Sequence, residues 1–229
     1  MTGLELREAL TWHVRPFSPD TARRVVNLVV AGAGLLLAAP VMLVVAVLIK
    51  LTSRGPVLYS QPRVGIDRRV PGQASTNHHR REDRGGKLFT IYKFRTMDSG
   101  NGRRGAEVWA TKDDPRVTPL GRVLRRYRID ELPQFFNVLR GDMNVVGPRP
   151  EQPAIFARLR AEVPGYQGRQ RVPPGITGWA QVNQRYDSCL DDVRRKVALD
   201  LEYVSRQSVL EDLRILARTV PVVLRKGGW

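Results

Sequence analysis

An uncharged apolar run near the N-terminus restricts what this chain can fold into more than any other feature. No residue between Arg24 and Lys50 is charged, and most of residues 25–51 are aliphatic. As a straight helix this stretch would be on the order of 35 Å long, enough to cross the hydrocarbon core of a bilayer. It is too long and begins too late for a cleaved signal peptide. The run therefore predicts a membrane helix over residues 25–51, preceded by a segment of residues 1–24.

Pro40 lies near the middle of the run and complicates a simple span. A proline inside a helix removes one backbone hydrogen bond and clashes with the preceding turn, so a kink is expected there. Arg23 and Arg24 precede the run while Lys50 and Arg54 follow it, so the positive-inside rule selects no orientation. A re-entrant helix broken at Pro40, with both ends on the cytoplasmic side, satisfies both flanks. A kinked single span is the alternative, since proline does occur in membrane helices.

The charge balance indicates an anionic partner. The 229 residues carry a formal net charge of +16, and the sequence pI is about 11. Such an excess of Lys and Arg suits nucleic acid, an acidic membrane surface or a phosphorylated substrate. A nucleic-acid binder would interleave aromatic and basic residues or carry a recognisable module, and neither is evident. The single cysteine, Cys189, excludes an internal disulfide.

Residues 52–229 read as a mixed, mostly helical domain. The stretch 55–65 looks extended, and Lys87–Met97 alternates like a strand, so we expect a small β-hairpin. Between them, residues 66–86 form a polar, arginine-rich insert that we interpret as a mobile loop. We expect helices over 113–128, with Asp114 as N-cap, and over 130–139. Residues 191–225 have amphipathic helical spacing with arginines, which is typical of helices in a membrane interface, although packing on the core is the alternative.

Carboxylates surrounded by basic residues are the main candidates for chemistry, because no nucleophilic Ser or Cys motif and no phosphate-binding glycine loop is present. The adjacent pair Asp130 and Glu131 stands at an expected helix start, where the helix dipole favours the ionised form. An ionised aspartate can bind Mg²⁺ or attack a phosphoryl centre. Helix capping is the ordinary alternative for such a pair.

Four basic residues are candidates for binding phosphate. Two prolines flank Arg149, which restricts where its guanidinium can point and suits bidentate capture of a phosphate. Lys93 and Arg95 are spaced by two on the expected strand and therefore share a face. Arg125 lies one turn before Asp130 and could hold a diphosphate. Each could equally be a solvated surface residue when taken alone.

The order of these motifs resembles that of the bacterial sugar transferase family, the small monotopic phosphoglycosyl transferases. The resemblance runs from about residue 25 to residue 229. The matching pieces are Ile49–Leu51 with Gly55–Leu58, Lys93–Met97, Asp113–Gly121, Arg128–Gln134, Asn137–Met143, Val146–Pro150 and Pro174–Val182.

This resemblance implies a polyprenyl-phosphate sugar-1-phosphate transferase of the bacterial inner membrane. Its catalytic domain, residues 52–229, would lie on the cytoplasmic face. Asp130 would attack a UDP-sugar, UMP would leave, and polyprenyl phosphate would accept the phosphosugar in the first membrane step of a surface glycan or exopolysaccharide pathway. Asp130 and Glu131 would be the catalytic and metal-binding residues with Mg²⁺ as cofactor, and Lys93, Arg95, Arg125 and Arg149 would bind phosphates.

The resemblance also implies a re-entrant helix broken at a Ser-Pro pair, for which this chain has Ala39-Pro40. Membrane lipids would be partners, nucleic acid would not, and a homodimer is expected by analogy alone. Two rival interpretations remain: a non-catalytic single-span membrane scaffold and a basic nucleic-acid-binding protein. Neither gives a reason for the order in which Lys93, Asp130 and Arg149 occur.

Overall fold

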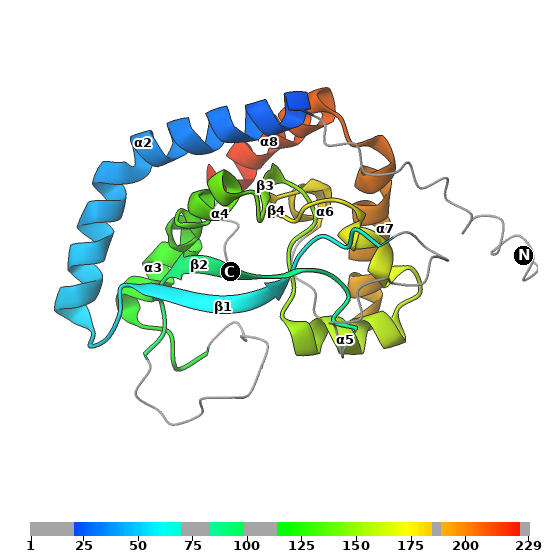
Figure 1. The fold of residues 1–229 in the computed structure, drawn as a ribbon. Coiled ribbons are helices and arrows are strands. Elements are labelled where there is room, and N and C mark those ends of the chain that lie inside the picture. The colour runs from blue at the N-terminus through cyan, green and yellow to red at the C-terminus, as the bar shows by residue number, and fades with distance from the viewer. Residues whose placement is uncertain (1–20, 70–82, 99–113, 185–188, 225–229) are drawn as a thin grey trace, which may run out of the picture.

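The computed structural model describes residues 21–69, 83–98, 114–184 and 189–224 (Figure 1). Its elements confirm the predicted α+β, mostly helical fold with a small β-hairpin. The segment 1–20 and residues 70–82, which make up most of the predicted insert 66–86, lie outside the described residues. In chain order the elements are α2 (Thr21–Thr52), β1 (Leu58–Val64), β2 (Leu88–Phe94), α3 (Pro119–Arg126), η1 (Ile129–Glu131), α4 (Gln134–Arg140), β3 (Asn144–Val146), α5 (Pro153–Glu162), η2 (Tyr166–Arg171), β4 (Gly175–Thr177), α6 (Trp179–Asn183), α7 (Leu190–Arg206) and α8 (Val209–Leu224).

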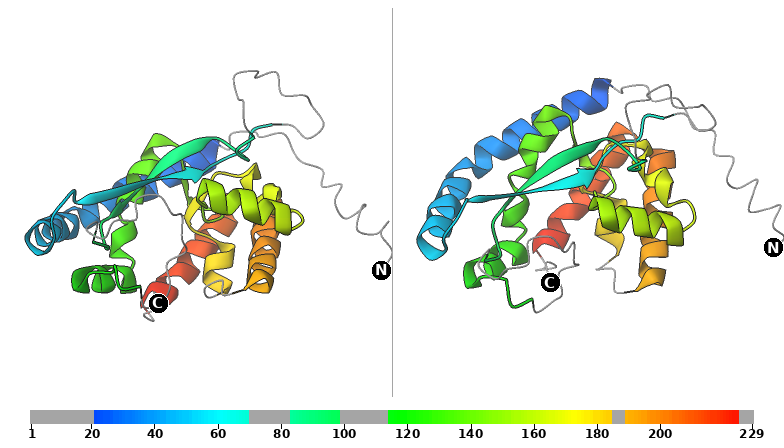
Figure 2. Two further views of the ribbon diagram at one scale, coloured as in Figure 1. Left: turned by 90° about the horizontal axis from the view of Figure 1, so that it is seen from below. Right: turned by 60° about the horizontal axis from the view of Figure 1, so that its bottom comes forward.

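Helix α2 is one continuous helix that bends sharply part-way along its length (Figures 1 and 2). Pro40 is the proline inside it, and a proline is the ordinary cause of such a bend. By length and composition α2 could cross a membrane, and only 11% of its most apolar window is buried. Its exposed apolar side chains include Leu36, Leu37 and Leu43. A helix with this much apolar surface exposed needs a hydrocarbon environment.

Both halves of α2 pack on the rest of the protein. In the first half, Ala31 is fully buried, and the Asn27 side-chain oxygen accepts a 2.6 Å hydrogen bond from the amide of Val145. In the second half, Val45 and Ile49 are buried in a cluster with β2 and α3 side chains. The two ends of the helix are therefore attached to the same body.

The N-terminal end of α2 has a buried polar anchor. Arg23 forms a 3.0 Å ion pair with Asp212 of α8 and donates a 2.6 Å hydrogen bond to the Tyr203 hydroxyl of α7. All three side chains are buried. Because a buried charge is costly without a partner, this contact fixes where α2 begins relative to α7 and α8. Figure 1 shows α8 lying along the first half of α2.

Strands β1 and β2 form the predicted antiparallel hairpin, with Leu58 opposite Phe94 and Val64 opposite Leu88. Helix α4 is joined to β2 by Asn137, which is fully buried. The Asn137 side chain donates to the Thr90 carbonyl (2.6 Å) and accepts from the Tyr92 amide (3.1 Å). The side-chain amide thus fixes the distance between β2 and α4.

A second, two-stranded parallel sheet was not predicted from the sequence. Strand β3 pairs with β4, with Asn144 opposite Gly175 and Val146 opposite Thr177. Glycine is required here for lack of space: a Cβ on Gly147 would lie 2.4 Å from the Pro173 carbonyl oxygen. The two segments therefore approach backbone to backbone. This contact brings together the Val146–Pro150 and Pro174–Val182 motifs.

The helix boundaries differ in two places from those expected. Helix α3 begins at Pro119 rather than after Asp114, and the Thr118 hydroxyl caps it by accepting from the Gly121 amide (2.9 Å). Asp114 instead pairs with Arg116 at 2.6 Å. The expected helix over 130–139 is divided into the short η1 turn and α4. The two C-terminal helices are present as α7 and α8, and α7 buries Val193 and Val197 against α5 and η2.

Candidate active site

The adjacent carboxylates Asp130 and Glu131 lie on a single 3₁₀ turn between α3 and α4. Arg128, just before the turn, has a φ of +55°, the left-handed conformation that a side chain seldom adopts. Such backbone strain is often found at functional sites. The reversal at Arg128 turns the chain so that both carboxylates are buried, at 7% and 6% exposure.

Glu131 is surrounded by cations. Its Oε1 atom accepts from Lys93 Nζ at 2.8 Å and from Arg149 Nη2 at 2.7 Å. Its Oε2 atom lies 3.6 Å from Arg128 Nη1. Three segments distant in sequence, β2, η1 and the loop after β3, thus meet at one carboxylate. By contrast, no hydrogen bond or ion pair occupies the Asp130 carboxylate within the residues that the structure describes.

This difference in partners separates the pKa values of the two carboxyls. Burial raises the pKa of Asp130 to about 6, although Lys93 opposes the rise. Burial also acts to raise the pKa of Glu131, but Arg149 and Lys93 hold it well below its usual range. Burial lowers the pKa of Lys93, and Glu131 counteracts that effect. A pair of carboxyls with separated pKa values is the arrangement in which one can react while the other stays ionised.

The position of Arg149 is set by its loop. In this loop, Gly147–Pro150, the Gly147 amide donates to Thr177 of β4 (2.8 Å), and the Pro148 carbonyl accepts from Gly175 (3.0 Å). The Arg149 carbonyl accepts from Arg169 Nη2 at 3.0 Å. The two prolines were expected to restrict this guanidinium, and these backbone bonds restrict it further.

Arg169 was missed in the sequence analysis, because nothing in the sequence distinguishes a buried arginine from the many exposed ones. Its side chain is fully buried. It forms a 2.7 Å ion pair with Asp200 of α7 and donates to the Tyr166 hydroxyl at 2.8 Å. A buried guanidinium with several hydrogen bonds is held rigidly. Arg169 therefore links α7 to the Arg149 backbone and fixes the distance between them.

Four of the six predicted site residues meet: Lys93, Asp130, Glu131 and Arg149. Arg125, on α3, is close enough to lower the pKa of Asp130. Arg95 is not with them. Strand β2 ends at Phe94, and the buried Arg95 guanidinium turns to the end of α2, where it donates to the carbonyls of Ser53 (2.9 Å) and Arg54 (2.8 Å). The shared-face argument required the strand to continue through Arg95.

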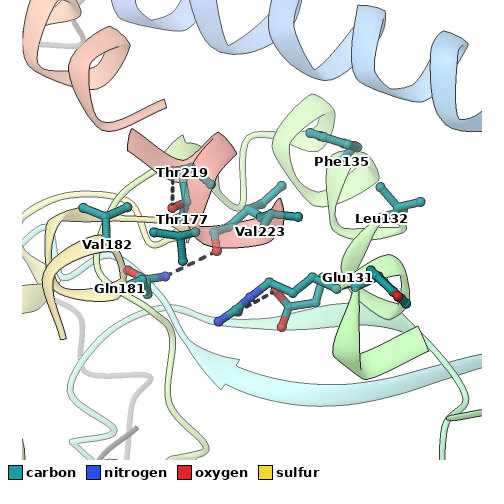
Figure 3. Close-up of a pocket in the computed structure, with 12 residues that line it drawn as sticks. Glu131, Leu132, Phe135, Thr177, Gln181, Val182, Thr219 and Val223 are labelled. Atoms are coloured by element: carbon teal, nitrogen blue, oxygen red, sulfur yellow. Dashed lines mark hydrogen bonds and ion pairs between the residues drawn. The ribbon is translucent and has the colours of Figure 1, made fainter. Parts of the chain in front are cut away.

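A pocket of about 190 Å³ opens beside this cluster (Figure 3). Glu131 and Arg128 line it at one end. Apolar side chains from the turn before α4 and from α4, β4, α6 and α8 form its walls: Leu132, Phe135, Ile176, Val182, Val222 and Val223. The ionic cluster therefore adjoins an apolar cavity, an arrangement suited to a ligand with a charged and an apolar part.

The acidic pair Asp130 and Glu131 offers Mg²⁺ two carboxylates. Among the described residues, no group of three or more His, Cys, Asp or Glu side chains could hold a metal by itself. Mg²⁺ is commonly held by one or two carboxylates, with substrate phosphates and water completing its coordination. Asp130 fits that pattern because its carboxylate has no partner in the described part of the chain, whereas Glu131 is already paired with Lys93 and Arg149.

Comparison with known proteins identifies the family. The family model for bacterial sugar transferases matches residues 18–226, nearly the whole chain. The chain belongs to the bacterial sugar transferase family. The matched residues include α2 and every residue of the ionic cluster.

Curated relatives are about 40% identical to the chain over the residues that align. The UDP-N-acetylgalactosamine-undecaprenyl-phosphate N-acetylgalactosaminephosphotransferase of Aeromonas hydrophila is 42% identical over 206 residues, which cover 90% of this chain and 44% of that protein. The undecaprenyl-phosphate glucose phosphotransferase of Komagataeibacter xylinus is 41% identical over 225 residues, covering 96% and 38%. The exopolysaccharide production protein PSS of Rhizobium leguminosarum bv. phaseoli is 38% identical over 200 residues, covering 85% and 91%. The chain thus spans less than half the length of the first two.

Proposed function

We propose that this protein is a phosphoglycosyl transferase that moves a sugar-1-phosphate from a UDP-sugar to polyprenyl phosphate. The observation that carries the proposal is the pair of adjacent carboxylates in different environments. Glu131 is held ionised by cations, while Asp130 is buried without a partner in the described chain and has a pKa near 6. Relatives whose names specify UDP-sugars and undecaprenyl phosphate support these two substrate classes.

In the proposed reaction the Asp130 carboxylate attacks the phosphorus that bears the sugar. A bond forms between Asp130 and that phosphorus, the bond to the bridging oxygen breaks, and UMP leaves with the electron pair. An oxygen of polyprenyl phosphate then attacks the aspartyl-phosphosugar. Asp130 leaves as a carboxylate, and a polyprenyl diphosphate sugar is released. Covalent catalysis of this kind replaces one difficult transfer step by two easier displacements.

The cations have a defined part in this scheme. Lys93, Arg149 and Arg128 lie around Glu131, and Arg125 is close to Asp130. The cations outnumber the two carboxylates, so the site has positive charge available for a diphosphate. Mg²⁺ bound by Asp130, and by Glu131 if it exchanges a cation, would neutralise further charge on the diphosphate.

We further propose that α2 is re-entrant, so that the site lies at the cytoplasmic surface of the inner membrane. The support is that both halves of α2 pack on one body, with Asn27 anchored to Val145 and Ile49 buried beside β2. A span would carry one end to the far side of the bilayer, away from that body. The pathway role in surface glycan synthesis rests on relatives such as the Rhizobium exopolysaccharide production protein. A homodimer stays a prediction.

An assay of UMP release tests the proposed reaction. The purified chain in lipid nanodiscs is incubated with Mg²⁺, undecaprenyl phosphate and each of a panel of UDP-sugars. We expect UMP release with at least one donor, and we expect continued turnover to require the lipid. Release of UDP instead of UMP, or turnover that is indifferent to the lipid, would contradict the proposal.

A further inference from the structure

The apolar part of the pocket beside Glu131 has few polar side-chain atoms. The hydroxyls of Thr177 and Thr219 bond to each other at 2.8 Å (Figure 3), and the Thr219 hydroxyl also donates to the Ile215 carbonyl at 2.8 Å. The Gln181 side-chain amide donates to the Ile176 carbonyl at 3.3 Å, and its Oε1 atom is a buried acceptor without a hydrogen-bond partner in the described chain. A polar ligand such as a uracil ring would need more donors and acceptors than these mostly apolar walls offer.

The size and lining of the pocket suit branched hydrocarbon. Apolar cavities of about 150 Å³ lined by Leu, Ile and Phe stay dry and bind benzene. This pocket is slightly larger, at about 190 Å³, and six aliphatic or aromatic side chains line it. Burial of apolar ligand surface against such walls is the expected source of affinity.

The surroundings of the pocket indicate which hydrocarbon ligand it would bind. At one end, Glu131 lines the pocket and is also the residue that binds Lys93 and Arg149. A ligand in the pocket is thus one side chain away from the cations. At the wall formed by α4, the Phe135 ring packs on α2, where a Cβ on Gly34 would lie 2.9 Å from its Cζ atom. The pocket therefore lies between the anion-binding cluster and the membrane helix.

We propose that this pocket holds the first isoprene units of the acceptor lipid while its phosphate lies among Lys93, Arg149 and Arg128. The proposal rests on the proposed function, because only a lipid whose phosphate reaches Asp130 needs its hydrocarbon there. A phospholipid acyl chain has no such requirement, since its head group takes no part in the transfer. Val223 and Val222 of α8 would contact the isoprene units from one side, and Leu132, just after η1, from the other.

Photocrosslinking tests the site independently of turnover. A prenyl phosphate with a diazirine in its first isoprene unit is irradiated with the full chain in nanodiscs, and labelled peptides are mapped. We expect label in residues 132–135 and 219–223, removed by excess undecaprenyl phosphate and retained in excess phosphatidylglycerol. Label confined to the outer face of α2, or equal competition by phosphatidylglycerol, would overturn the proposal. So would an absence of label in residues 132–135 and 219–223.

Filling the pocket supplies the matched kinetic test. Val223→Trp should raise the KM for undecaprenyl phosphate about tenfold, the change expected when contact equivalent to roughly two methylene groups is lost. Val220→Trp is the control, because Val220 is exposed on the same helix and does not line the pocket. If Val223→Trp does not fold, Val182→Trp fills the pocket from the opposite wall. An acceptor KM equal to that of the control would contradict the assignment.

The outcomes separate this inference from the proposed function. If the parent protein forms a phosphosugar adduct from the donor alone but the probe does not enter the pocket, the inference fails and the function stands. If the probe enters the pocket but no donor ever yields an adduct or UMP, the proposed function fails and the pocket remains a prenyl phosphate site.

Discussion

Asp130 and Glu131 are adjacent carboxylates with opposite environments. Glu131 has three cationic neighbours within 3.6 Å, and Asp130 has no ion pair in the described chain. In the proposed function this difference divides the roles: Glu131 would hold the basic side chains in place, and Asp130 would react. The same pairing explains how the half-buried Lys93 can stay charged, since Glu131 matches its charge at 2.8 Å.

The pKa of Asp130 predicts how adduct formation depends on pH. Because the nucleophile must be ionised, the rate of phosphosugar adduct formation should fall as the pH drops through about 6. Glu131 should contribute no second transition there, since its pKa is held well below the usual range. Rapid-quench measurements from pH 5 to 8 with the donor alone check this. A rate that stays constant down to pH 5 would show that burial does not raise this pKa.

At the residue scale the sequence predicted which charged residues meet at the site, but it did not predict which polar side chains are buried. The cluster of Lys93, Asp130, Glu131 and Arg149 was anticipated, because motif order and residue chemistry are visible in a sequence. Arg95 was grouped with Lys93 by strand periodicity, yet the strand ends one residue earlier and Arg95 binds the end of α2. Asn137 and Arg169 were given no role, since the β2 carbonyl that Asn137 binds and the carboxylate that pairs with Arg169 lie 47 and 31 residues away in the chain.

The elements that position the site are short, and their contacts are made by backbone. Strands β3 and β4 have three residues each, too few for a periodic pattern to reveal them. The glycines around these strands indicated turns in the sequence. The structure shows that glycine is needed there because the two backbones approach closely. Strand β2 and the amphipathic helix α7 were predictable because each shows its period over seven or more residues, whereas β1 was expected only as an extended stretch. Thr118-Pro119 and Asp114-Pro115 carry the same capping signature, so the sequence could not decide where α3 begins.

The β3–β4 crossing gives a prediction at this scale. Gly147→Ala should destabilise the protein by about 1–3 kcal/mol, because its Cβ would lie 2.4 Å from the Pro173 carbonyl oxygen and the loop must move. Adduct formation should fall as well, since Arg149 belongs to that loop. Thermal unfolding and donor-only kinetics measure the two effects. Gly32→Ala is the control, because a Cβ there meets nothing within 4 Å. Equal behaviour of the two variants would rule out close packing at Gly147.

For the whole molecule, the bent helix α2 relates the site to the bilayer. It is attached to the body at Arg23 and Asn27 near one end and at Ile49 near the other. The sequence identified the apolar run and the proline but left two topologies open. Packing of both halves on one body favours the re-entrant one, because a bilayer crossing would separate the two attachments.

Cysteine labelling tests this topology. In a Cys189→Ser background, which removes the exposed native thiol, Ala22→Cys and Thr52→Cys place one thiol at each end of α2. We expect an impermeant maleimide to label both thiols in inside-out vesicles and neither in intact spheroplasts. Labelling of the two positions from opposite sides would establish a single span and refute the re-entrant helix.

The central claim is that Asp130 becomes covalently attached to a phosphosugar. Its most direct test is the intact mass of the purified chain after brief exposure to UDP-sugars with Mg²⁺ and no lipid acceptor. We predict a mass increase of one phosphosugar with the correct donor, lost on later addition of undecaprenyl phosphate and absent in Asp130→Asn. That variant should remain folded, since it removes a charge whose burial is unfavourable. An adduct of the same mass on folded Asp130→Asn would contradict the account.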